Sequence, residues 1–226
     1  MAAAKKKKGG FTRKVIKNNP SMQVVRDSNS EFTECSIFLK EFKIALRPIL
    51  SHFRVGSLHQ RLMQLFLKIK SLDRVSTPGN LNVADGLRTE KGRLLLREFT
   101  FTPKAGIRHF FGNPVMGQDD FSVVWDPFEP SQARFPKGAT HWELLYLVLT
   151  YHRDLKQFST VAATPIRRAK TDGPERLELR PDKPVVSGSD LQHILVLSLR
   201  FIELIGNEEY PLLGKDSVGI EVFGVV

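Results

Sequence analysis

Thirteen basic side chains in the first third of the chain are the residues best suited to bind a partner. Lysine and arginine neutralise phosphates or the carboxylates of an acidic protein, and such contacts weaken as salt is added. Steps of three, four and seven residues predict that several of them share helix faces. The thirteen residues are Lys5, Lys6, Lys7, Lys8, Arg13, Lys14, Lys17, Lys40, Lys43, Arg47, Arg54, Arg61 and Lys68.

Positive charge is concentrated at one end of the chain. Residues 1–75 hold 16 Lys and Arg against 5 Asp and Glu, a net charge of +11. Residues 76–226 hold the other 18 against 19, a net charge of −1. The simplest interpretation is that these helix faces are solvated and that the lysine run is a solubilising tail. The alternatives are contacts of the basic end with a nucleic acid or with another acidic partner.

Two small clusters of metal-ligating residue types occur in the second part of the chain. His141 and Glu143 are two residues apart in a predicted strand and therefore point to the same side. Asp119, Asp120 and Asp126 flank another predicted strand, where turns commonly contain aspartate. One histidine beside one glutamate is more typical of a structural pair. We therefore expect no metal site and no cofactor.

Motifs of nucleophilic catalysis and phosphate binding are missing from the sequence. Ser187-Gly188-Ser189 lacks the glycine frame of a nucleophile elbow. Lys91-Gly92-Arg93 is predicted to be a turn before a strand and not a phosphate-binding loop. Cys35 is the one cysteine of the chain, and its place in an apolar stripe predicts a buried, unreactive thiol. We expect a protein that is not an enzyme.

Residues 1–27 are predicted to form a flexible basic arm. They contain too few apolar residues to offset the entropy of ordering. The lysine run Lys5–Lys8 is followed by no apolar stretch, so it does not resemble a secretory signal. No window is long and apolar enough to span a membrane. The expected location is the cytoplasm, with export as part of a particle or appendage left open.

Residues 28–75 are predicted to form a helical hairpin. Ser28-Asn-Ser-Glu31 has the form of a capping box, and Pro48 should end or kink the first helix. Ser57-Leu-His-Gln60 predicts the start of a second helix, and the short link between the two implies an antiparallel pair. The first helix has an apolar stripe at helical spacing, made of Phe32, Cys35, Phe38, Leu39, Phe42, Ala45, Leu46 and Ile49.

Residues 76–226 are predicted to form an antiparallel, immunoglobulin-like β-sandwich, which makes the whole chain α+β. Turn residues occur at Pro78-Gly79-Asn80 and Asp85-Gly86, and Gly206-Asn207 fits a hairpin. The segment Thr140–Tyr151 is apolar on both faces, which predicts a central strand. The predicted strands are Leu94–Phe101, Phe121–Trp125, Thr140–Tyr151, Phe158–Ala163, Arg176–Leu179, His193–Leu204 and Val218–Val225.

The order of short segments along the chain resembles an uncharacterised bacterial protein family of similar length. That family has a basic N-terminus, two helices and a β-rich C-terminal half, and the resemblance implies this architecture without any activity. The chain departs from it at the start, where Lys5–Lys8 and Gly9-Gly10 replace a longer strand-like segment. The segments are Arg26, Glu31-Phe32, Ala45-Leu46-Arg47-Pro48, Arg61-Leu62, Asp85-Gly86-Leu87, Phe99-Thr-Phe101, Gly138-Ala-Thr-His141, Arg200-Phe201, Gly206 and Tyr210-Pro-Leu212.

Three functions remain open from the sequence. The leading hypothesis is a non-enzymatic structural or interaction protein, specifically a self-assembling subunit whose residues 5–47 contact its neighbours. The alternative is a nucleic-acid-binding accessory protein that grips phosphates with the same basic residues, although the aromatic residues that single-strand binders interleave with such charges are missing. The third is a ligand-binding module in which aromatic residues of the β-rich part line a groove and do not only fill the core.

Overall fold

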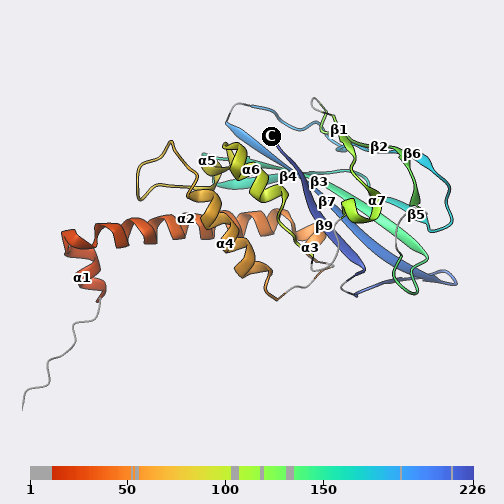
Figure 1. Cartoon of the computed structure of the whole chain (residues 1–226), viewed down its shortest axis with the longest axis horizontal. Coiled ribbons are helices and arrows are strands. Elements are labelled where there is room, and N and C mark those ends of the chain that lie inside the picture. Colours follow the sequence, from red (N-terminus) through yellow and green to blue (C-terminus); the bar gives the residue numbers. More distant parts are fainter. Residues whose placement is uncertain are drawn as a thin grey trace, which may run out of the picture.

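The computed structural model describes residues 12–51, 53, 56–102, 107–117, 120–130, 135–188, 190–214 and 216–226. These residues form a mixed α+β fold in which most helices precede an antiparallel sheet (Figure 1). The helices are α1 (Arg13–Asn18), the 3-10 helix η1 (Pro20–Met22), α2 (Gln23–Ala45), α3 (Arg47–Leu50), α4 (Leu58–Lys70), α5 (Val83–Leu87), α6 (Glu90–Arg97) and α7 (Ile107–Phe111). The strands are β1 (Val115–Met116), β2 (Val123–Phe128), β3 (His141–His152), β4 (Gln157–Ala162), β5 (Ile166–Ala169), β6 (Glu175–Leu179), β7 (Leu191–Ile205), β8 (Glu208–Pro211) and β9 (Val218–Val225).

Two long strands form the centre of the larger sheet. β3 and β7 pair antiparallel, from His141 opposite Ile202 to His152 opposite Leu191. β4 and β5 lie along the outer edge of β3, and β8 and β9 lie along the outer edge of β7. A second antiparallel sheet has the strand order β1-β2-β6. The α+β class and the antiparallel sheet are confirmed, and the immunoglobulin-like form stays a prediction.

The larger sheet is covered on both faces. Trp142 and Tyr146 of β3 pack with Val123 of the smaller sheet, whereas Leu147 and Leu149 belong to the core formed with the helices. Successive residues of a strand point to opposite faces, so a strand apolar on both sides must lie between two layers. The central position predicted for this strand is confirmed.

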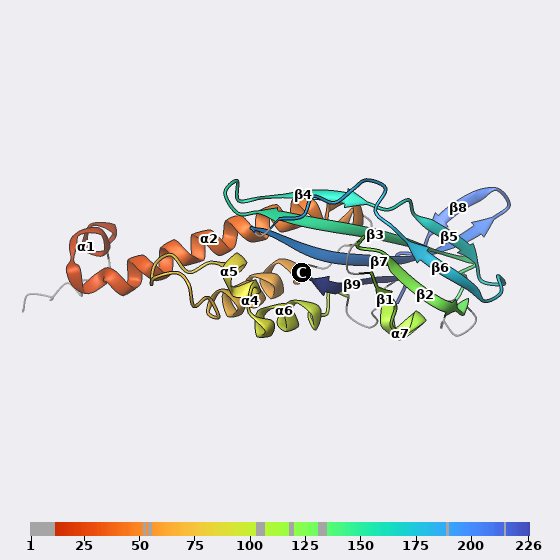
Figure 2. The same cartoon turned by 90° about the horizontal axis from the view of Figure 1, so that it is seen from above.

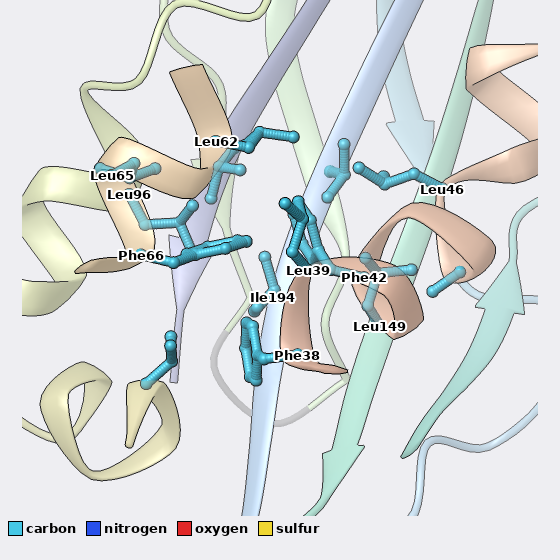
Figure 3. Packing of buried hydrophobic residues seen from close by; sticks show 14 of the residues in the cluster. Phe38, Leu39, Phe42, Leu46, Leu62, Leu65, Phe66, Leu96, Leu149 and Ile194 are labelled. Atoms are coloured by element: carbon cyan, nitrogen blue, oxygen red, sulfur yellow. The ribbon is translucent and has the colours of Figure 1, made fainter. Parts of the chain in front are cut away.

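Helices α2 and α4 pack as the predicted antiparallel pair. The Sγ atom of Cys35 lies 3.9 Å from the carbonyl oxygen of Phe66, and Glu31 forms an ion pair with Lys70. Residue numbers at these contacts increase along α2 and decrease along α4, so the two helices are antiparallel. Figure 3 shows how their buried side chains pack with those of the sheet and of α6. The labelled residues are Phe38, Leu39 and Phe42 of α2, Leu46 between α2 and α3, Leu62, Leu65 and Phe66 of α4, Leu96 of α6, Leu149 of β3 and Ile194 of β7.

One apolar core joins the helices to the sheet. Phe42 of α2 lies 5.4 Å from Phe66 of α4 and 5.8 Å from Phe158 of β4, measured between ring centroids. The same cluster includes Ile194 and Val222 from the sheet. Residues on both sides of the predicted boundary between residues 75 and 76 therefore belong to the same core.

The predicted start of the first helix is wrong. α2 begins at Gln23, five residues before Ser28, and Ser28 is in its interior. The amide oxygen of Asn19 accepts hydrogen bonds from the backbone and hydroxyl groups of Ser21, so the helical segment is capped further upstream. Seven of the eight predicted stripe residues are buried, but Phe32 is exposed.

The predicted strand Leu94–Phe101 is also wrong, because its first part belongs to helix α6. The hydroxyl of Thr89 caps this helix by accepting a hydrogen bond from the backbone of Gly92 at 3.0 Å. Alternation of apolar and polar residues over so short a segment did not distinguish the two-residue period of a strand from the 3.6-residue period of a helix, because the leucines of this segment also fit one face of a helix. The expected turns at Asp85-Gly86 and Lys91-Gly92-Arg93 are likewise helical.

Two glycines allow the small helices to pack closely. A Cβ atom at Gly86 would lie 2.0 Å from the carbonyl oxygen of Ile69, and one at Gly92 would lie 2.1 Å from the carbonyl oxygen of Gly86. Both distances are far below van der Waals contact. The absence of a side chain at both positions therefore allows α4, α5 and α6 to approach closely, and neither glycine forms a turn.

The other strand predictions are confirmed with small shifts at their ends. β3, β4, β6, β7 and β9 match the predicted segments, and β2 begins two residues later than expected. The hairpin at Gly206-Asn207 is confirmed, with Gly206 at a positive φ of 64°. The short strands β1, β5 and β8 were not predicted, because runs of two and four residues carry little periodicity.

Candidate interaction surface

The described part of the arm, residues 12–27, is built from short capped helices. The side chain of Thr12 caps α1, and Asn19 caps η1, in which Pro20 takes the first position. α1 has only six residues and contains none that is buried. A helix of this length has little stability of its own, so its position depends on contacts with α2.

Arg26 provides those contacts. Its guanidinium group donates hydrogen bonds to the carbonyl oxygens of Ile16 at 2.7 Å and Asn19 at 2.9 Å, and to the side chain of Gln23 at 2.6 Å. A positive charge at the C-terminal end of a helix also interacts favourably with its dipole. Arg26 therefore folds α1 back against α2 and has a structural role.

The arm projects beyond the body of the molecule (Figures 1 and 2). Apolar side chains of the arm are exposed. Val24 is 74 % exposed, although it is seven residues before the buried Glu31 and so lies on the side of α2 that faces the core. Val15 and Val25 are exposed as well. The core-facing side of α2 thus continues past the body without cover.

Basic side chains accompany this uncovered surface. Arg13, Lys14 and Lys17 are exposed on α1, and no described carboxylate pairs with them. The predicted partner-binding residues of the arm are therefore brought together as far as the structure describes them. Lys5, Lys6, Lys7 and Lys8 lie outside the described residues.

The basic residues on the body are divided between different surroundings. Lys40 is exposed and Lys43 half-buried on α2, and Arg47 is exposed at the start of α3. Arg61 donates a hydrogen bond to the carbonyl oxygen of Thr100 and lies 5.1 Å from the ring centroid of Phe99, so it has a structural role. Lys68 is exposed on α4, and Arg54 lies outside the described residues.

A hollow lined by arginines was not predicted from the sequence. Two adjoining hollows, of about 340 and 390 Å³, lie on either side of Tyr151 and Arg153 at the end of β3. Arg88 and Arg93 also line the smaller one. The near-neutral net charge of residues 76–226 concealed this cluster, since the fold alone brings the arginines together.

Most of that positive charge is already compensated. The buried carboxylate of Asp85 forms an ion pair with Arg153, and Arg88 lies 3.5 Å from Asp190. Asp85 also accepts a hydrogen bond from the side chain of Asn82 at 2.7 Å. The cluster thus links α5 to the end of β3, and its chemistry is that of a structural ion-pair network.

The candidate metal-ligating residues have other partners. Glu143 lies 2.5 Å from Arg200 and 3.0 Å from Arg167. Burial of this carboxyl opposes its ionisation, but the two arginines outweigh that effect and hold the pKa of Glu143 below its usual value. His141 shares a hydrogen bond of 2.9 Å with the hydroxyl of Thr140.

Aspartates of the second cluster are engaged with their own loop or a neighbouring strand. Asp120 accepts a hydrogen bond from the backbone of Ser122 at 3.0 Å, and Asp126 lies 3.4 Å from Arg176. Asp119 lies outside the described residues. Within the described parts of the chain, no group of three or more histidine, cysteine or acidic side chains is placed to hold a metal ion.

Cys35 should resist thiol reagents in the folded protein. Its side chain is fully buried between α2 and α4, and burial raises the pKa of its thiol to about 11. We expect Ellman's reagent to modify the native protein only at the rate at which it unfolds, and to modify denatured protein within the mixing time. Immediate modification under native conditions would contradict the burial.

Comparison with known proteins gives no relative from which an activity could be transferred. No protein-family model, curated protein or solved structure matches the chain. The resemblance to an uncharacterised bacterial family stays a prediction. Over the described residues, no helix has the length and apolar character needed to cross a bilayer.

Proposed function

We propose that this chain is a non-enzymatic interaction protein whose basic N-terminal region, residues 5–47, contacts neighbouring molecules, with self-association as its leading form. The observation that carries the proposal is the uncovered apolar side of α2 around Val24, next to three unpaired basic residues of α1. Apolar surface at the end of a projecting helix is stabilised when a partner removes it from water.

The rest of the molecule acts as the scaffold in this proposal. Its two sheets share an apolar cluster around Trp142, and we propose that they form a sandwich of the immunoglobulin-like type. The buried aromatic residues fill this cluster, which supports a packing role in place of a ligand groove. Such a body keeps the arm at a fixed place on each copy.

Deleting residues 1–25 should abolish self-association while leaving the body folded. The deletion removes α1, η1 and the uncovered residues Val24 and Val25, and it keeps α2 from Arg26 onward. We expect light scattering after size exclusion to give a mass that rises with concentration for the full chain and a monomer mass for the variant. The far-ultraviolet circular dichroism spectrum of the variant should show that the body is still folded. Deleting residues 1–4 alone, which precede the proposed contact region, is the matched control and should retain association. A full chain that is monomeric at high concentration would contradict the proposal.

Nucleic-acid binding is the second candidate, supported by the unpaired Arg13, Lys14 and Lys17 together with Lys40 and Arg47. Gel-shift titrations at about 50 and 200 mM salt separate the two functions. Phosphate contacts would give a shift that weakens steeply over this range, and the absence of any shift at the lower salt concentration would contradict this second function.

A further inference from the structure

A hairpin at the other end of the molecule carries a second uncovered surface. β7 and β8 extend beyond the body on the side opposite to α1 (Figure 2). All four residues of β8 are exposed, and Ile205 at the end of β7 is 59 % exposed. Isolated two-stranded hairpins have little stability in water, so such an extension is expected to have a partner.

One face of this hairpin combines apolar and acidic side chains. Glu203 lies opposite Tyr210 and Ile205 lies opposite Glu208 in the antiparallel register, so all four side chains point to the same side. The hydroxyl of Tyr210 donates a hydrogen bond to Glu208. We call these four residues the hairpin face.

The neighbouring acid on β8 belongs to the opposite face. Glu209 lies opposite Leu204 and forms an ion pair with Arg167 of β5. Its charge is therefore compensated within the molecule. Glu203 and Glu208 have no basic partner among the described side chains, so the hairpin face is acidic.

The chemistry of the hairpin face is complementary to that of the arm. The arm has exposed apolar residues, Val24 and Val25, beside the basic residues Lys14 and Lys17. The hairpin face has exposed apolar groups beside two carboxylates. Since the two surfaces lie at opposite ends of the long axis, they cannot meet within one molecule (Figures 1 and 2).

We propose that the arm of one copy docks on the hairpin face of the next copy. This inference rests on the proposed self-association and adds the surface that receives the arm. Contact between two different surfaces at opposite ends is heterologous, so it repeats from copy to copy and produces an open chain unless the rotation closes a ring. The outer edge of β8, which pairs with no described strand, lies beside the docking site.

Reciprocal charge reversal tests the docking. One variant carries Lys14→Glu and Lys17→Glu on the arm, and the other carries Glu203→Lys and Glu208→Lys on the hairpin face. Each alone places like charges across the contact, and we expect self-association of each to be roughly tenfold weaker or more. In an equimolar mixture every contact again joins opposite charges, so sedimentation velocity should show assemblies of the full-chain size.

A control variant and two contrary outcomes separate the docking site from self-association itself. Lys91→Glu with Arg97→Glu makes the same charge change at two exposed positions on α6, and this variant should associate like the full chain. Unchanged association of the hairpin variant, or a mixture that does not recover, would overturn the docking site while leaving self-association intact. An unmodified chain that stays monomeric would instead overturn the proposed function.

Discussion

Phe42→Ala should lower the free energy of unfolding by about 3–5 kcal/mol. Phe42 is fully buried, and its ring contacts Phe38, Phe66 and Phe158 from α2, α4 and β4. Truncation leaves a cavity where helices and sheet meet, so both should lose stability together. Denaturant unfolding followed by dichroism at 222 nm and by tryptophan fluorescence should show one common midpoint, shifted equally for both probes.

The two probes report on different layers, which makes the experiment informative. Both tryptophans of the chain, Trp125 and Trp142, lie in the cluster between the two sheets, which is separate from the core that contains α2 and α4. Ile44→Ala is the matched control on α2, because Ile44 is 53 % exposed, and it should change stability by no more than about 0.5 kcal/mol. Loss of the helical signal before the fluorescence change would show that the helices form a separate unit.

Asp85→Ala should cost about 3 kcal/mol of stability. The Asp85 carboxylate has no exposed area, and its removal takes away the ion-pair partner of Arg153 and the shortest hydrogen bond of the Asn82 side chain. The loss lies at the lower end for a buried ion pair because the guanidinium of Arg153 is partly exposed to water. Equilibrium denaturation in urea measures the difference.

Asp190→Ala provides the comparison for this network. Asp190 pairs with Arg88 at 3.5 Å, but its side chain is 83 % exposed, so its removal should cost less than about 1 kcal/mol. Equal effects of the two substitutions would contradict the structural role assigned to Asp85. Equal effects would also make anion binding a candidate role for the arginine-lined hollow, because its arginines would then not be held by a structural ion pair.

The proposed assembly is supported by the difference in stability between the body and the arm. The body has an extensive core, whereas α1 contains no buried residue and is held by the hydrogen bonds of Arg26. Segments with few buried contacts open at low free-energy cost. The arm can therefore adjust to a neighbouring copy without disturbing the body.

Elements with a regular local period were accessible from the sequence. The stripe from Cys35 to Ile49 identified the buried faces of α2 and α3, and the doubly apolar run around Tyr146 identified the central strand. In both cases many residues repeat the same signal, so one dominant period emerges. The basic residues of the arm could be found in the same way, because charge is visible residue by residue.

Short or ambiguous segments depended on contacts between distant parts of the chain. α6 is a helix because Thr89 caps it and Gly92 fits against Gly86, neither of which alternation around Leu96 reveals. Arg61 looked like a binding residue, yet the fold places it on Phe99. Long-range packing assigns such side chains their roles, because it sets what surrounds them and local sequence does not.

The same reason explains the two surfaces of the proposed assembly. Charge and composition indicated the arm, but nothing local showed that Val24 would lie beyond the body or that Glu208 and Ile205 would share one face at the opposite end. Exposure and relative position are properties of the folded chain as a whole. They follow from how far the core extends, which is fixed by packing between residues far apart in the sequence.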